Sequence, residues 1–359
     1  MEDQIKREAA EDQIKREAAD GAGAEAPKTK EWLALFEEDA LLKVTDLRVQ
    51  FKTERALVKA LNGVDLIIRK GESLGLVGET GAGKTTTALS VLKLLQRDIS
   101  RIMEGSSILY DGKSVFQMAE NELRAMRGGK IAMVFQNPLT ALNPVFTVGE
   151  QIAMVLRAHQ GMNNSNALRR AGELLEVVGI AAYRIKDYPF QFSGGMRQRV
   201  GIAAALACNP QLLIADEPTT ALDVTIQAQV LELMKELQTR YSSSLLMITH
   251  NLGIISELCQ QVAVMYAGRV IEYGTVHDVF VSPLHPYTKG LLGALPKLRG
   301  PRSELTTIPG VIADAQNLPG GCAFHPRCED CDEACRTGQP AMRHVENGHF
   351  VACFDRGEG

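Results

Sequence analysis

The sequence has no long apolar run, no hydrophobic segment at its start and no strong excess of charge of one sign. Its longest apolar stretches, 200–208 and 211–215, are far too short to cross a bilayer. The acidic N-terminus lacks the apolar core of a secretory signal. A net charge of −4 gives no global sign of nucleic-acid binding. These absences favour a cytoplasmic protein that meets a membrane only through a partner.

The chain of 359 residues is 45% hydrophobic, which is enough for one large domain and an appendage. Residues 2–10 read EDQIKREAA, and residues 11–19 repeat them letter for letter. Only Ile5 and Ile14 are large and apolar in this repeat, too few to pack as a helix. We expect a solvated tail, with a partner-binding helix as the alternative.

A flexible linker is expected at residues 21–27, where Gly and Ala precede Pro27. Beyond it, Trp32, Leu35 and Phe36 would share one face of a helix. That face could anchor on a membrane surface, but packing against the body of the chain is the favoured interpretation. Residues 1–40 are therefore predicted to be a tail, largely flexible.

From residue 41 the pattern changes to the alternation of β-strands, and then strands and helices follow each other in turn. Residues 148–178 are mainly helical, most clearly at 171–178. This order predicts an α/β fold with a largely parallel sheet covered by helices, preceded by two antiparallel strands. The strands are expected at 42–51, 64–68, 212–215, 245–248, 262–266 and 269–273.

A Gly-rich segment, GETGAGKT, follows the apolar run 74–77 and leads into a segment of helical composition. Strand, Gly-rich turn and helix in this order predict a phosphate-binding loop. The glycines allow backbone N–H groups to point into one concavity, and the helix N-terminus adds its positive dipole end. Lys84 should reach the β- and γ-phosphates, and Thr85 should hold Mg²⁺. The predicted nucleotide-binding residues here are Gly78, Glu79, Thr80, Gly81, Ala82, Gly83, Lys84, Thr85 and Thr86.

A second apolar strand, 212–215, ends in two adjacent carboxylates, Asp216 and Glu217. Asp216 would anchor Mg²⁺ opposite Thr85. Glu217 would polarise the water that attacks the γ-phosphate. The phosphate loop upstream makes this pair a strong candidate for ATP hydrolysis.

With these two motifs in place, the chain resembles the ATP-binding subunits of ABC transporters, and the segment 192–199 is similar to their signature sequence. Ser193 would cap a helix running to about residue 207, where Gly194 and Gly195 expose backbone N–H groups. The resemblance implies that this helix start meets the γ-phosphate held by a partner cassette. Met196 stands where the family usually has Gln, and we expect little loss from that change.

The resemblance extends to four further positions. Gln136 matches the Q-loop and could coordinate Mg²⁺ or the attacking water, and His250 matches the switch histidine that contacts the γ-phosphate. Asp223, in the Ala-Leu-Asp of residues 221–223, matches the loop that crosses the dimer interface. Phe51 falls where the family stacks an aromatic ring on adenine.

Two other classes of ABC ATPase do not match this sequence. Only 57 positions separate Gln136 from Ser193, too few for the coiled-coil insertion of chromosome and DNA-repair ATPases. Translation factors of this type carry two cassettes, whereas each motif occurs once here. The resemblance therefore implies a P-loop ABC domain at 41–281, with a RecA-like core, an antiparallel β-subdomain and a helical subdomain at about 137–200.

Beyond residue 282, Pro becomes frequent and cysteines begin, which predicts a small separate C-terminal module at 282–359. The segments 283–292, 308–310 and 318–319 resemble the C-terminal extension of oligopeptide, dipeptide and nickel importers. The phrases at 137–144 and 219–229 are typical of the same subfamily.

Five of the seven cysteines crowd into the last 40 or so positions, and four converging thiolates can hold zinc or an iron–sulfur cluster. The resemblance implies a [4Fe–4S] cluster, with zinc as the alternative and reduced thiols as the remaining possibility. Cys331 is an extra thiol relative to the family pattern and an alternative ligand. The ligands that match best are Cys322, Cys328, Cys335 and Cys353.

Together these features imply an ATPase subunit that uses ATP and Mg²⁺ to power import of di- or oligopeptides. Its expected partners are a second, related ATPase chain, two membrane permease subunits and, indirectly, an extracytoplasmic peptide-binding protein, with no nucleic acid. It would lie on the cytoplasmic face of the membrane as a peripheral subunit. The alternatives are an importer ATPase for nickel or another solute, and a regulatory ATPase with no role in transport.

Overall fold

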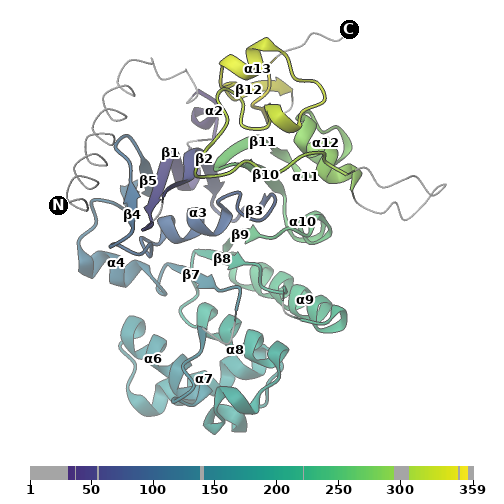
Figure 1. The fold of residues 1–359 in the computed structure, drawn as a ribbon. Coiled ribbons are helices and arrows are strands. Elements are labelled where there is room, and N and C mark those ends of the chain that lie inside the picture. The colour runs from purple at the N-terminus through teal and green to yellow at the C-terminus, as the bar shows by residue number, and fades with distance from the viewer. Residues whose placement is uncertain are drawn as a thin grey trace.

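The computed structural model describes residues 31–36, 38–54, 56–137, 141–220, 222–294, 307–346 and 348–354 (Figure 1). The predicted N-terminal repeat and linker lie outside these residues, as does Ala221. Within the described ranges, no helix combines the length and apolar character that crossing a bilayer requires.

An antiparallel sheet forms around the two long strands that open the cassette. Its order is β2-β1-β5-β6, and β4 pairs with β1 beside β5. The alternation seen in the sequence places Leu42 and Val44 on the buried face of β1, and register shifts after Val44 bring Val49 into the core as well. The strands are β1 (Ala40–Lys52), β2 (Leu57–Arg69), β4 (Ser100–Ile102), β5 (Ser107–Tyr110) and β6 (Lys113–Ser114).

The larger sheet carries the nucleotide motifs and has the order β12-β13-β11-β10-β3-β9-β8-β7. One end of it is formed by β12 (Arg343–Glu346), β13 (His349–Val351) and β11 (Arg269–Thr275). The pairs β10–β3, β3–β9, β9–β8 and β8–β7 are parallel, which confirms the expected largely parallel sheet. Every position of three of these strands is buried, as expected for strands covered on both faces. The parallel strands are β3 (Ser73–Val77), β7 (Ile131–Val134), β8 (Leu212–Asp216), β9 (Ser244–Ile248) and β10 (Gln261–Tyr266).

A group of helices forms a lobe beyond the edge strand β7 (Figure 1). It consists of α6 (Val148–Gln160), α7 (Asn164–Val177), η2 (Ala182–Lys186), η3 (Pro189–Gln191) and α8 (Gly194–Leu206). Of these, α8 joins the lobe to the sheet through its contacts with β7. The helices that accompany the sheets are α3 (Lys84–Val91), α4 (Glu120–Met126), α9 (Val224–Tyr241), α10 (Leu252–Leu258) and α11 (Val276–Val281).

The C-terminal region differs from the predicted separate module because its last strands extend the cassette's own sheet. The strand β11 (Arg269–Thr275) runs antiparallel to β10, and β13 pairs with it at Glu272–Val351 and Tyr273–Phe350. An unpaired sheet edge leaves backbone groups free to bind another strand, and β13 satisfies them here. The elements of this region are α12 (Pro286–Gly293), η4 (His325–Arg327), α13 (Glu333–Thr337), β12 (Arg343–Glu346) and β13 (His349–Val351).

The predicted aromatic face near residue 32 packs against the chain itself, as favoured over a membrane anchor. The helix α2 (Glu31–Ala34) is only one turn long, so the expected helical face does not continue to Leu35, which is 66% exposed. Leu33 is buried in its place. The ring of Trp32 lies 5.0 Å from that of Tyr273 and 5.3 Å from that of Phe350, measured between centroids.

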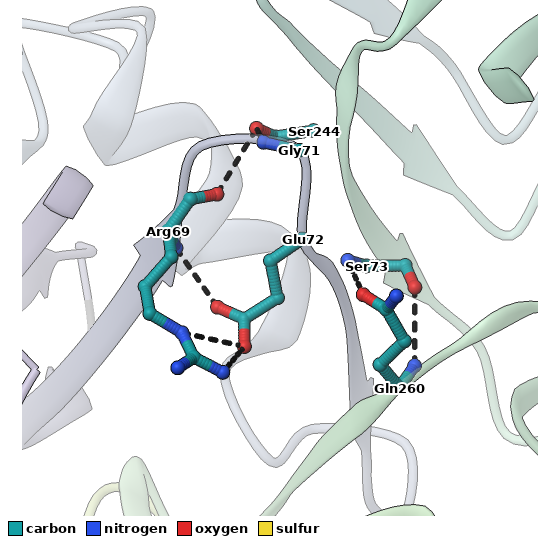
Figure 2. Close-up of polar contacts among 6 residues, drawn as sticks. All are labelled: Arg69, Gly71, Glu72, Ser73, Ser244 and Gln260. Carbon is teal, nitrogen blue, oxygen red and sulfur yellow. Dashed lines mark hydrogen bonds and ion pairs between the residues drawn. The ribbon is translucent and has the colours of Figure 1, made fainter. Parts of the chain in front are cut away.

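A polar turn before β3 fixes the end of that strand opposite the phosphate loop (Figure 2). Glu72 is buried, and its carboxylate accepts hydrogen bonds from the Arg69 backbone N–H at 2.8 Å and from the Arg69 guanidinium at 2.6 Å. Ser244, at the start of β9, accepts from the Gly71 N–H and donates to the Arg69 carbonyl. Ser73 and Gln260 exchange a reciprocal pair of hydrogen bonds, so three parallel strands are held in register at this end.

Candidate nucleotide-binding site

The predicted phosphate loop connects β3 to α3, and its glycines meet a steric demand at two positions. Gly78 has φ 151°, and an added Cβ would lie 2.3 Å from the Met265 carbonyl oxygen. Gly83 has φ 101°, and an added Cβ would lie 2.6 Å from Leu61 Cδ2. No other residue fits these positions without displacing the neighbouring strands. The loop therefore wraps closely on the sheet and opens at the N-terminus of α3.

Lys84 is folded back into this loop. Its Nζ donates hydrogen bonds to the carbonyl oxygens of Gly78, at 2.7 Å, and Glu79, at 3.1 Å. Burial lowers the pKa of Lys84, although the carboxylates of Glu217, Asp216 and Glu79 act in the opposite direction. A cationic group held at the N-terminus of a helix is suited to binding a polyphosphate chain.

Thr85 and Asp216 meet at the mouth of the loop, where Thr85 Oγ1 donates to Asp216 Oδ1 at 3.1 Å. Burial raises the pKa of Asp216, while the hydrogen bond from Thr85 and the charge of Lys84 lower it. A hydroxyl and a carboxylate are the oxygen ligands that Mg²⁺ prefers. These two residues fit a magnesium ion, which would neutralise charge on a bound triphosphate.

Glu217 follows β8 in a left-handed backbone conformation with φ 45°, which is uncommon for a residue with a side chain. Its N–H donates to the Ile248 carbonyl oxygen at the end of β9, and this contact holds the residue at the junction of two strands. Burial acts to raise the pKa of Glu217, but hydrogen bonds with Thr220 and His250 outweigh it and lower the pKa overall. The carboxylate is therefore ionised and able to accept a proton or orient a water.

Three side chains from separate loops converge on the Glu217 carboxylate. Gln136 Nε2 donates to Oε2 at 2.9 Å, and His250 Nδ1 lies 3.2 Å from Oε1. Thr220 Oγ1 donates to Oε2 at 2.8 Å. The side chain of His250 is 58% exposed, whereas that of Glu217 is 14% exposed. The structure thus brings together the three predicted catalytic residues Glu217, Gln136 and His250, and leaves their outer side open.

The predicted signature helix is α8, which begins directly after Ser193. The Ser193 hydroxyl accepts from the Met196 N–H at 3.4 Å, so it caps the helix as expected. An added Cβ on Gly195 would lie 2.3 Å from Ile226 Cγ2, so this glycine allows α8 to pack closely on α9. Ser193 and Gly194 are exposed. Figure 1 places α8 with α6 and α7, apart from the chain's own phosphate-binding helix α3.

The remaining predicted residues lie as follows. Asp223 caps α9, because its carboxylate accepts from the Ile226 N–H at 2.9 Å, and its side chain is otherwise exposed. Phe51 is half-buried near the end of β1, and its contact with adenine stays a prediction. Gly81 and Thr80 are exposed at the tip of the phosphate loop, whereas Ala82 is buried beneath it.

The cysteine cluster predicted in the C-terminal region does not form a metal site in the described structure. Among the described residues, no group of three or more His, Cys, Asp or Glu side chains lies close enough together to hold a metal ion. The Cys322 N–H donates to the Cys335 carbonyl oxygen, so backbone contacts join two of the predicted ligands. The described structure therefore does not support the iron–sulfur cluster predicted at Cys322, Cys328, Cys335 and Cys353.

Sequence reasoning missed three residues that contact the site. Thr220 lies within a segment typical of the peptide-importer subfamily, and a hydroxyl three residues after a carboxylate can donate a hydrogen bond to it, as it does here to Glu217. Tyr287 and Arg327 both bind Glu79 of the phosphate loop from more than 200 positions away in the chain, and no local pattern indicates such contacts.

The fold and the site define an ATP-binding cassette of the ABC type, and comparison with known proteins agrees. The family model described as "ABC transporter" matches residues 61–220, and that described as "Oligopeptide/dipeptide transporter, C-terminal region" matches residues 271–335. A model for an AAA domain, putative AbiEii toxin, overlaps the first at 185–256. The dimeric, ADP- and Pi-bound ATP-binding cassette MJ0796 has a TM-score of 0.59 and 27% identity, over 66% of this chain and 98% of that one.

Comparison with curated proteins identifies a narrower family within the ABC cassettes. It is 50% identical to the oligopeptide transport ATP-binding protein AppD of Bacillus subtilis, over 88% of this chain and 96% of the relative. It is 46% identical to the oligopeptide transport ATP-binding protein OppD of Escherichia coli, over 90% and 95%. The chain belongs to the family of ABC transporter ATP-binding proteins that carry the oligopeptide/dipeptide transporter C-terminal region.

Proposed function

We propose that this chain hydrolyses ATP at an interface between two cassettes and thereby powers import of di- or oligopeptides through membrane permease subunits. The observation that carries the proposal is the convergence of Gln136, His250 and Thr220 on Glu217, beside the Thr85–Asp216 pair. The names of the relatives AppD and OppD support the peptide as cargo.

In this proposal, Lys84 and the loop N–H groups bind the β- and γ-phosphates, while Thr85 and Asp216 would hold the magnesium ion. That ion supplies charge neutralisation of the phosphate oxygens when bound. Glu217 orients a water for attack on the γ-phosphate, and Gln136 and His250 hold the carboxylate in place. His250, Gln136 and Thr85 are exposed, so a second cassette is needed to exclude bulk solvent from the γ-phosphate.

A partner's Ser193-led helix start is suited to this closing role because it presents free N–H groups and a positive dipole end to an anion. The helical lobe also carries exposed aromatic side chains, with Tyr183 81% and Phe190 70% exposed. Tyr188 stacks on Phe190 at 5.8 Å between centroids. Exposed apolar patches of this kind mark interaction surfaces, and we assign this one to a permease subunit on the cytoplasmic face of the membrane.

The test is the variant Glu217→Gln, which keeps the size of the side chain but removes its charge. We expect ATP turnover to fall at least ~100-fold, because the general base is lost, while ATP binding is retained. With ATP bound, the variant should remain associated with its partner cassette in size-exclusion chromatography. Turnover at the level of the parent protein would contradict the assigned role.

The control for this experiment is Glu257→Gln, which neutralises an exposed carboxylate on α10. It should hydrolyse ATP at the parent rate. Copurification of the chain with membrane subunits, and stimulation of its ATPase activity by peptides in that complex, separate an importer from a purely regulatory ATPase.

The proposed function assigns no role to an iron–sulfur cluster, because the described structure does not support one. Its independent test is the visible absorbance of the anaerobically purified full chain, together with its iron content.

A further inference from the structure

The C-terminal region contacts the phosphate loop at Glu79. Arg327 Nη1 lies 2.7 Å and Nη2 3.2 Å from the two carboxylate oxygens of Glu79, which forms a two-point ion pair. The hydroxyl of Tyr287 accepts a hydrogen bond from the Glu79 N–H at 2.9 Å. Both the side chain and the backbone of this loop residue are therefore held by the segment that follows the cassette.

Arg327 is itself rigidly placed. Its side chain is only 4% exposed, and its Nε donates to the Pro309 carbonyl oxygen at 2.9 Å. Its guanidinium carbon lies 5.8 Å from the ring centroid of Tyr266 and 5.9 Å from that of Phe324. A planar guanidinium fixed in this way binds both oxygens of a carboxylate, and a lysine ammonium cannot reproduce this two-point contact.

Tyr287 is equally fixed. It is fully buried, and its ring centroid lies 4.8 Å from that of Tyr266 and 5.5 Å from that of Phe324. The same aromatic cluster thus supports both residues that contact Glu79. Tyr266 is the last residue of β10. Two residues later, the Gly268 N–H donates a hydrogen bond to the Ala82 carbonyl oxygen of the loop.

These contacts matter because the loop must accept a polyanion. A carboxylate at the second position of the loop repels phosphate unless a cation neutralises it, and Arg327 is that cation. The Glu79 carbonyl oxygen also accepts from Lys84 Nζ and from the Ala82 N–H. A shift of Glu79 would therefore move the lysine that reaches the phosphates.

We propose that Arg327 and Tyr287 are positioning residues through which the C-terminal extension sets the affinity of the phosphate loop for ATP. They act through Glu79 and touch none of the reacting atoms. This role rests on the proposed ATPase function and adds to it a second task for the extension, beyond any contact with partner subunits.

The experiment uses the full-length chain and the variant Arg327→Gln. We expect the Kd of ATP and the KM for MgATP to rise about tenfold or more, because the Glu79 carboxylate is no longer neutralised. The kcat should change less than about threefold, because Glu217, Gln136 and His250 are untouched. Tyr287→Phe should raise the Kd several-fold, since the Glu79 N–H loses its acceptor.

Two further variants separate positioning from general stability. The double variant Glu79→Gln/Arg327→Gln removes both charges and should recover most of the lost affinity. Arg336→Gln, which removes an exposed arginine on α13 of the same region, should bind ATP like the parent chain. Arg327→Lys keeps the positive charge but cannot make the two-point contact, and it should give an intermediate Kd of ATP.

Folded Arg327→Gln with the ATP affinity of the parent chain would overturn the proposal. So would a double variant as weak as the single one, because that result indicates a structural loss alone. If Arg327→Gln does not fold, Arg327→Lys and Tyr287→Phe carry the same test. If the parent chain itself gives no ATP-dependent thermal shift, the proposed ATPase function fails instead, which keeps the two conclusions distinguishable.

Discussion

At the scale of single residues, the site depends on side chains whose protonation is controlled by their surroundings. Glu217 is kept ionised by hydrogen bonds, and Lys84 is held in the loop by two carbonyl oxygens. His285 is a buried example outside the site. It is 1% exposed, it caps α12 by accepting from the Tyr287 N–H at Nδ1, and its backbone N–H donates to the Glu272 carboxylate.

His285 predicts a loss of stability in mild acid. Burial lowers its pKa to about 4, despite the opposing charge of Glu272, whereas an unfolded histidine titrates near its ordinary value. Between these two pKa values the unfolded state binds a proton that the folded state does not, so the free energy of unfolding falls as the pH falls. At pH 5 this contribution amounts to about 2 kcal/mol relative to pH 7.

The measurement is urea unfolding of the parent chain and of His285→Asn at pH 7 and pH 5. Asparagine keeps a capping acceptor but does not titrate in this range. The variant should therefore lose about 2 kcal/mol less than the parent between the two values. Equal losses in both proteins would show that His285 does not carry the effect.

At the scale of elements, the strand β3 is fixed at both ends. The phosphate loop occupies one end, and the turn with Arg69, Glu72 and Ser244 occupies the other (Figure 2). Because β3 lies between β9 and β10, this turn also fixes the strands that lead to His250 and to the Tyr266 cluster. The register of the site therefore depends on a polar turn that contains no nucleotide-binding residue.

Glu72→Ala should lower the free energy of unfolding by about 1–3 kcal/mol, because the Arg69 N–H and guanidinium lose a buried, charged acceptor. The matched control is Asp111→Asn, which removes the exposed ion pair between Asp111 and Lys70 and should cost about 0–1 kcal/mol. Chemical denaturation measures both. Equal costs for the two variants would show that the buried turn contributes no more than a surface pair.

Elements with strong local signals could be predicted from the sequence. The strand before Gly78 was predictable because a strand buried on both faces has a continuous run of apolar residues. The helix after Ser193 was predictable because serine is a preferred helix-capping residue. The short strands β12 and β13 were not, because four- and three-residue segments show no periodicity, and their pairing depends on the distant edge of β11. The contact between Arg327 and Glu79 could not be predicted either, because the two residues are far apart in the sequence.

At the scale of the whole molecule, the two ends of the described chain meet on one edge of the structure. Trp32 and Phe36 pack against Tyr273 and Phe350, which lie on the paired strands β11 and β13. Trp32 and Phe36 are thus part of the packed body of the chain, and the C-terminal region is joined to the cassette by a shared sheet and a shared aromatic cluster.

Trp32→Ala should destabilise the protein by about 2–4 kcal/mol, since a large buried side chain is removed from this cluster. Leu35→Ala, three positions away and 66% exposed, should change the free energy of unfolding by no more than ~0.5 kcal/mol. Thermal or urea unfolding of the two variants gives the comparison. A Trp32 variant as stable as the Leu35 variant would show that the N-terminal segment does not contribute to the fold.

The pairing of β13 with β11 also has a consequence for the order in which the chain is made. The edge of β11 stays uncovered until residues 349–351 leave the ribosome, although the phosphate loop has emerged long before. During synthesis, that edge is open to pairing with other nascent chains, which is the hazard of every exposed strand. Premature termination near residue 340 should therefore give aggregated protein rather than a shortened but active enzyme.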